Sequence, residues 1–258
     1  MKALLLDTNV VFDIIYIQRP RFAEAHNFYT GFNNFALSIE PRVHKECNTV
    51  LLEYAVSFAT ELENYIVAKQ KHMKAWNLLK PSQRKSLLNG FVSFAVQRNG
   101  DDQDGKIPFY RQIIDKVGVE LTRMTYSELR EFLLEISPRM MGHLRAEMRA
   151  RFVYLIPMVD IANIATYKFI DDLKNKLAGT YFKQKQSEDR AILVSVIHLI
   201  TFGDTDGNSF ESITFYTYDD PFLESYQAVC SNPPKLTLID YDNYLTEGLR
   251  ALTMRKPY

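Results

Sequence analysis

The feature that most constrains the fold is the alternation of short β-forming runs with segments of helical length. Apolar or alternating runs over residues 3–6, 35–40, 212–220 and 235–240 predict strands, and a segment with helical spacing follows each of them. Successive strands that are joined through helices run parallel, because the helix carries the chain back to the starting end of the sheet. The sequence therefore predicts an α/β protein with an open parallel sheet flanked by helices.

The middle of the chain is more helical than a crossover between two strands requires. Residues 55–118 and 138–185, taken roughly, predict a helical insertion packed on the core of a single domain that covers residues 1–258. Between these two stretches, residues 119–125 alternate as a strand would, and Ser127 is expected to cap the helix that follows. The hydrophobic content of 47% is sufficient for a core of this size.

The balance of charge and the two cysteines restrict the environment and the partners. Thirty-one basic residues match thirty-one acidic ones, so a polyanion must be bound by a local basic patch or through a metal. Cys47 and Cys230 are far apart in the sequence and suit buried thiols in a reducing compartment. No run is long enough to span a membrane, and the apolar run before Asp7 is too short for a signal peptide. We therefore expect a cytoplasmic location.

Four acidic residues are expected at the edge of the sheet where the strands end. Asp7 and Asp219 terminate predicted strands, whereas Glu46 and Asp189 lie in the first turns of predicted helices. Clustered carboxylates repel one another, and their burial adds to the cost, so together they require a cation. Ligands that are all oxygen indicate Mg²⁺ or Mn²⁺ rather than Zn²⁺.

Each of these acids also has a purely structural interpretation. Asp7 and Asp219 could cap the helices that follow them, and Asp189 could complement a helix dipole. Glu46 could lie on a solvated helix face, and Glu40 and Glu53 are alternatives to it as the second acid of the site. It is the conjunction and order of the four acids that favour a shared site.

Four short segments carry a resemblance to a known family. "LLLDTNVV" at residues 4–11 is similar to the opening of PIN-domain nucleases, in which a hydrophobic strand ends on Asp-Thr/Ser-Asn. "VHKECNTVL" at 43–51 resembles the second-acid helix of that family, and "EDRAILVSVI" at 188–197 resembles its third-acid helix. "FYTYDDPF" at 215–222 resembles its closing strand with Thr-x-Asp. The four segments occur in the order of the family, whereas the helical middle resembles nothing in it.

The resemblance implies a PIN-like core and a metal-dependent ribonuclease, which hydrolyses RNA phosphodiester bonds with a metal-activated water. It implies that Asp7, Glu46, Asp189 and Asp219 are the catalytic residues and the ligands of Mg²⁺ or Mn²⁺. Thr8, Asn9, Thr217 and Asp220 are the residues that would support them. An inhibitory antitoxin-like protein or self-association is a further implied partner, with no role for a membrane. The alternative is a PIN-like scaffold that binds RNA or assembles complexes without catalysis.

Basic residues of the segment 139–151, and those that lead into the predicted helix at Asp189, are the first candidates for contacts with RNA phosphates, although solvated faces are the default interpretation of such residues. They are Arg145, Arg149, Lys183, Lys185 and Arg190.

Overall fold

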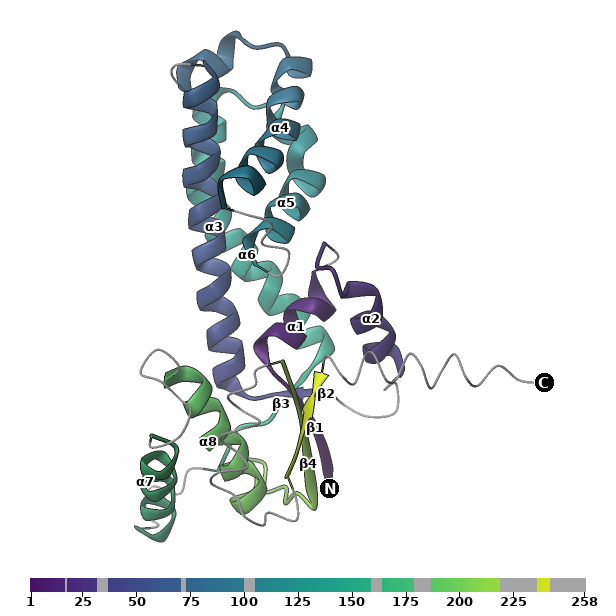
Figure 1. Ribbon diagram of the computed structural model, residues 1–258, viewed down its shortest axis with the longest axis vertical. Coiled ribbons are helices and arrows are strands. Elements are labelled where there is room, and N and C mark those ends of the chain that lie inside the picture. Colours follow the sequence, from purple (N-terminus) through teal and green to yellow (C-terminus); the bar gives the residue numbers. More distant parts are fainter. Residues whose placement is uncertain are drawn as a thin grey trace, which may run out of the picture. The chain divides into compact units, whose positions relative to one another are not determined.

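The computed structural model describes residues 1–16, 18–31, 37–70, 73–99, 105–158, 164–178, 187–218 and 236–241. The chain divides into two compact units. The first, called the sheet unit below, comprises residues 1–12, 24–47 and 149–258; the second, called the helical unit, comprises residues 13–23 and 48–148. Figure 1 shows the elements of both units in chain order.

The sheet unit is built on a five-stranded sheet in which every pair of neighbouring strands is parallel, in the order β3-β2-β1-β4-β5. The prediction of a parallel α/β sheet flanked by helices is therefore confirmed. The strands are β1 (Lys2–Leu6), β2 (Leu37–Ile39), β3 (Val153–Tyr154), β4 (Ser212–Thr217) and β5 (Leu236–Asp240).

The central strand β1 is where the strand order reverses. From β1 the sheet extends through β2 and β3 on one side and through β4 and β5 on the other. Leu5 and Leu6 of β1 are fully buried, which explains the continuous apolar run. In an open parallel sheet, ligands bind outside the carboxyl ends of the strands at such a reversal. The end of β1 is therefore the first place to search for a site.

Four of the described helices belong wholly or mainly to the sheet unit: α1 (Thr8–Ile15), α2 (Phe22–Gly31), α7 (Ile164–Ala178) and α8 (Ser187–Phe202). The helix that the sequence predicts around Asp189 is confirmed by α8, in which Ile192, Val196 and Leu199 form a fully buried stripe. From α2, Phe28 makes edge-to-face contacts with the rings of Tyr216 and Tyr241. Aromatic contacts thus join α2 to the end of the sheet.

The helical unit has an aromatic core. Phe58, Phe91 and Tyr110 come from three different helices and contact one another with ring centroids 5.4–5.6 Å apart. The helices of the unit include most of α3 (Pro41–Gln70) and of α6 (Tyr126–Arg151), the end of α1 (Thr8–Ile15), and α4 (Pro81–Asn99), α5 (Lys106–Leu121) and the 3-10 helix η1 (Met73–Leu78). In both units, none of the described helices is long and apolar enough to cross a membrane.

The predicted strand at residues 119–125 is wrong. Residues up to Leu121 complete α5, and a turn leads to α6. The helix cap is Thr125 rather than Ser127: the Thr125 hydroxyl accepts a hydrogen bond from the Glu128 N–H at 3.3 Å, and the Glu128 carboxylate accepts one from the Thr125 N–H at 2.6 Å. This reciprocal pair is a capping box, which the Thr-x-x-Glu spacing could have indicated. In a strand, Val119 and Leu121 would lie on the same face of the sheet. Here Val119 is exposed and Leu121 is buried, as their positions in a helix allow.

Candidate functional site

Asp7 lies at the end of β1 and is the residue that joins this strand to α1. Its N–H donates to the carbonyl of Tyr216, and its own carbonyl accepts the N–H of Val11, the first hydrogen bond of α1. Asp7 therefore occupies the N-cap position of α1, and it is only 2% exposed. One carboxylate oxygen accepts the N–H of Thr8 at 2.8 Å, and the other accepts the hydroxyl of Thr217 at 2.7 Å. The last residue of β4 thus helps to orient the acid at the end of β1.

Thr8 links this carboxylate to Glu46. The hydroxyl of Thr8 donates a hydrogen bond to a carboxylate oxygen of Glu46 at 2.5 Å. Glu46 lies in the second turn of α3 and is half-buried. Asp7 and Glu46 are 39 positions apart in the sequence. Thr8 links them at the carboxyl edge of the sheet, because its N–H binds Asp7 and its hydroxyl binds Glu46.

Cys47 lies beside both of these acids. Its thiol is fully buried, and burial raises its pKa well above the ordinary value, with further contributions from the negative charges of Glu46 and Asp7. The electrostatic effect of both carboxylates on one thiol is further evidence that they lie near a common point. A thiol in these surroundings stays protonated at neutral pH. The sequence predicts a buried cysteine, but no pattern in it indicates the proximity of the thiol to the acids.

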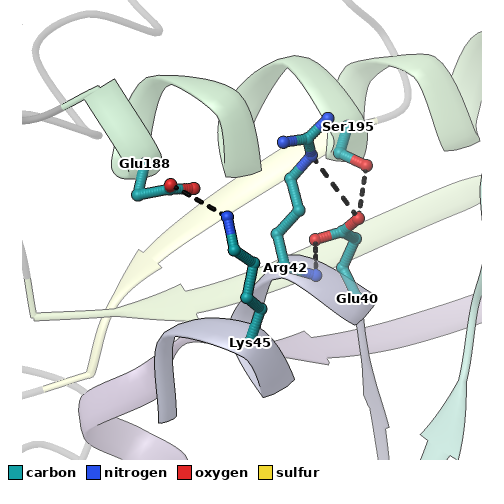
Figure 2. Close-up of polar contacts among 5 residues, drawn as sticks. All are labelled: Glu40, Arg42, Lys45, Glu188 and Ser195. Carbon is teal, nitrogen blue, oxygen red and sulfur yellow. Dashed lines mark hydrogen bonds and ion pairs between the residues drawn. The ribbon is translucent and has the colours of Figure 1, made fainter. Parts of the chain in front are cut away.

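Glu40 has a different role at the same edge. It follows β2, and its carboxylate accepts the N–H of Arg42 at 2.6 Å and the hydroxyl of Ser195 at 2.7 Å (Figure 2). Glu40 is 3% exposed, and this burial raises its pKa, although both hydrogen bonds and the charge of Arg42 act in the opposite direction. Glu40 therefore caps α3 and joins it to α8. Glu53, the other alternative to Glu46, is an exposed residue of the helical unit.

Asp189 is a half-buried residue of the first turn of α8. Its neighbour Glu188 accepts a hydrogen bond from Lys45 at 3.3 Å, and Figure 2 shows these two side chains extended toward each other from α8 and α3. Lys45 precedes Glu46, and Glu188 precedes Asp189. The ion pair therefore holds the first turns of α3 and α8, which carry these two acids, close together.

The remaining predicted residues are distributed as follows. Asn9 is half-buried in the first turn of α1, and Arg190 is half-buried in α8. Arg145 and Arg149 are exposed on α6, the first in the helical unit and the second in the sheet unit. Four residues lie outside the described residues: Lys183, Lys185, Asp219 and Asp220.

Within the described ranges, no three Asp, Glu, His or Cys side chains are grouped closely enough to form a ligand set for a metal ion. Of the four acids that the resemblance assigns to the site, the structure describes Asp7 and Glu46, joined through Thr8, and Asp189 at the start of α8. Thr217, which binds Asp7, is two positions before Asp219 in the sequence.

Comparison of the chain with protein-family models, with curated proteins and with solved structures finds no match in any of the three.

Proposed function

We propose that this chain is a PIN-like, metal-dependent ribonuclease whose active site lies at the carboxyl end of β1. The observation that carries the proposal is the Asp7–Thr8–Glu46 link at the point where the strand order reverses. The resemblance of the four sequence segments to PIN-domain nucleases supplies the reaction and the substrate. The all-parallel sheet, with β1 at its centre, agrees with that family.

The chemistry of the donor groups suits Mg²⁺ or Mn²⁺. Asp7 and Glu46 offer carboxylate oxygens, whereas burial raises the pKa of the neighbouring Cys47 thiol and so disfavours the thiolate that a softer metal would require. Asp189 and Asp219 are the further ligands that the proposal assigns. When bound, the divalent cation would supply the positive charge that makes a water acidic and stabilises the charge developing on the phosphate.

The residues of the chain itself orient the acids. A carboxylate offers about four lone-pair sites, and Asp7 uses one on each oxygen for Thr8 and Thr217. These two hydrogen bonds fix the plane of the carboxylate. The hydroxyl of Thr8 does the same for one oxygen of Glu46. Thr8 and Thr217 are thus positioning residues for the two carboxylates.

The second candidate is an RNA-binding or assembly scaffold without catalysis. The observation that favours it is that Asp7 occupies the N-cap of α1 with both carboxylate oxygens hydrogen-bonded, which is also what a structural cap requires. The balance of 31 basic and 31 acidic residues leaves no overall positive charge to attract RNA, so within this alternative it favours an assembly role over RNA binding.

Cleavage assays on a matched pair of variants separate the two functions. Glu46→Gln and Glu53→Gln make the same change seven positions apart on α3, one at the proposed site and one on an exposed surface. With Mn²⁺ and a mixed RNA pool, Glu46→Gln and Asp7→Asn should lower the cleavage rate by about 10²-fold or more, the scale of losing a major electrostatic stabiliser. Glu53→Gln should cleave as fast as the wild type. EDTA should abolish cleavage by the wild type and by Glu53→Gln.

Two outcomes would contradict the ribonuclease. The first is a wild-type protein that binds the RNA pool but never cleaves it with Mn²⁺ or Mg²⁺, which would favour the scaffold. The second is a Glu46→Gln variant that cleaves as fast as Glu53→Gln, which would remove Glu46 from the site.

A further inference from the structure

The sheet unit contains a pocket of about 480 Å³ at the start of α3, the helix that carries Glu46. It is formed by the start of α3, by α7 and α8, and by the segment after β3. Its volume is within the range of pockets that hold small organic ligands, and like them it combines apolar walls with a few polar groups. The apolar walls are contributed by Ile156, Pro157, Ile170, Ala191 and Val194.

Three polar side chains at the pocket are themselves more than nine-tenths buried: Glu40, Ser195 and His198. Glu40 and Ser195 bind each other, but the Nε2 atom of His198 is buried without a hydrogen-bond partner in the described part of the chain. Burial lowers the pKa of this imidazole, and the backbone of Met158 opposes this effect only in part. A neutral imidazole nitrogen that lacks a partner is costly, and a ligand with a complementary polar edge would satisfy it.

Cationic groups surround the same pocket. Arg42, Lys45 and Lys174 line it from two helices, whereas Asp171 and Glu40 are the acids that line it. Figure 2 shows Lys45 paired with Glu188, and Arg42 with its guanidinium near Glu40 at 4.0 Å. Lys174 is an exposed lysine that α7 adds to the pocket. An apolar slot with a buried polar group and cations at its margin matches a flat heterocycle that carries a phosphate.

We propose that this pocket binds a nucleotide, with its base between the apolar walls and against His198 and its phosphate beside Lys174 and Arg42. The proposal rests on the proposed function, because it assigns the nucleotide to the RNA substrate. The Lys45–Glu188 ion pair joins the pocket-lining Lys45 to the first turn of α8, and these two residues immediately precede Glu46 and Asp189 in the sequence. A nucleotide within RNA and a free nucleotide share this chemistry, so the experiment has an arm for each.

The experiment measures the binding of AMP, GMP, CMP and UMP by titration calorimetry in EDTA, which removes any contribution from a metal. Lys174→Glu is paired with Lys176→Glu, the same change on an exposed residue of the same helix that does not line the pocket. Ala191→Trp fills the pocket without removing a polar group.

At least one nucleotide should bind the wild type. Lys174→Glu should weaken its binding about tenfold or more, the scale of one charge-assisted contact, and Lys176→Glu less than about twofold. Ala191→Trp should abolish binding.

The second arm repeats these measurements with a short RNA oligonucleotide in EDTA. A loss of RNA affinity in Lys174→Glu and Ala191→Trp, together with competition by the mononucleotide, identifies a substrate subsite. A loss confined to the mononucleotide identifies a site for a free nucleotide. Either result supports the nucleotide pocket. The exposed position of Lys174 keeps this variant informative even if Ala191→Trp does not fold.

Two results would overturn the inference: no mononucleotide binds the wild type, or binding is the same in Lys174→Glu and Lys176→Glu. Its failure is distinguishable from failure of the proposed function. If the protein cleaves RNA but Lys174→Glu leaves its affinity for nucleotides unchanged, the pocket alone is overturned. Nucleotide binding that depends on Lys174, in a protein that never cleaves RNA, would overturn the nuclease and leave the pocket.

Discussion

At the scale of single residues, Glu40 and Glu128 show how burial decides the effect of one chemical group. Both carboxylates accept backbone N–H groups at the start of a helix, Glu40 at α3 and Glu128 at α6. Burial raises the pKa of Glu40, because desolvation outweighs its hydrogen bonds. The hydrogen bonds to Thr125 lower the pKa of Glu128, which remains in water. The same capping geometry therefore stabilises the ionised form at one helix and fails to do so at the other.

These opposite shifts predict opposite dependences of stability on pH. A Glu in the unfolded chain has a pKa of about 4.3. Glu40, with its raised pKa, contributes stability that is fully present below this value and is lost as the pH rises through its folded pKa. Glu128 contributes stability that is present above about pH 4.3 and is lost as the pH falls through its lowered pKa.

The measurement compares the free energy of unfolding of the wild type with that of Glu40→Gln and of Glu128→Gln in urea, from about pH 3.5 to 8 in EDTA. The wild-type advantage over Glu40→Gln should shrink as the pH rises, and its advantage over Glu128→Gln should grow. Two slopes of the same sign would show that burial does not decide between these two carboxylates.

At the scale of elements, the packing of α3 against α4 depends on one glycine. A Cβ atom at Gly90 of α4 would lie 2.5 Å from the hydroxyl oxygen of Tyr65 on α3, and the next atom of that ring lies at 3.6 Å. Glycine inside a helix costs about 1 kcal/mol relative to alanine, so the residue is retained against the preference of the helix. The close approach of the Tyr65 hydroxyl is the physical reason.

We expect the sign of Gly90→Ala to depend on residue 65. In the wild type the added methyl group forces a shift of a buried ring, and the substitution should lower the free energy of unfolding by about 1–3 kcal/mol. In a Tyr65→Phe background the obstructing oxygen is absent, and Gly90→Ala should be neutral or stabilise by up to about 1 kcal/mol. A double-mutant cycle in urea measures this coupling. Equal effects of Gly90→Ala in both backgrounds would show that the hydroxyl is not the obstacle.

At the scale of the whole molecule, the proposed metal site links the folded state to the concentration of a cation. A ligand that binds only the folded protein adds about 2.7 kcal/mol of stability when its concentration is 100 times its dissociation constant. Mn²⁺ should therefore raise the melting temperature of the wild type, by an amount that increases with its concentration.

The variants of the cleavage assay make this linkage specific. The rise in melting temperature with Mn²⁺ should be kept in Glu53→Gln and largely lost in Glu46→Gln and Asp7→Asn, since only the latter two remove a proposed ligand charge. Scanning calorimetry with Mn²⁺ and with EDTA provides the measurement, independently of any activity. A rise of the same size in all four proteins would indicate that Mn²⁺ binds elsewhere on the chain.

Local patterns along the chain were enough to predict most of the sheet and one of its flanking helices. Continuous apolar runs identified β1 and its end at Asp7, and helical spacing identified α8 with its buried stripe. Four of the five described strands were predictable in this way because each coincides with an apolar or alternating run. β3 was not, since Val153 and Tyr154 are two residues without a buried face that pair with the edge of β2. The parallel arrangement followed from the alternation of strands and helices alone.

Which side chains meet was decided by the tertiary fold. The hydrogen bonds from Thr8 to Glu46 and from Thr217 to Asp7 join residues 38 and 210 positions apart, and no local pattern specifies such pairs. The different roles of Glu46 and Glu40 have the same origin. Both are acids near the start of α3, but Glu40 binds Ser195 of α8 whereas Glu46 binds Thr8.

His198 shows the same limit for a single buried side chain. Its position in an apolar helical segment predicts a satisfied core histidine, whereas the structure leaves its Nε2 atom without a partner among the described residues, at a pocket. Helical period specifies that a side chain is buried, but whether its polar atom finds a partner depends on the neighbours that the fold brings to it.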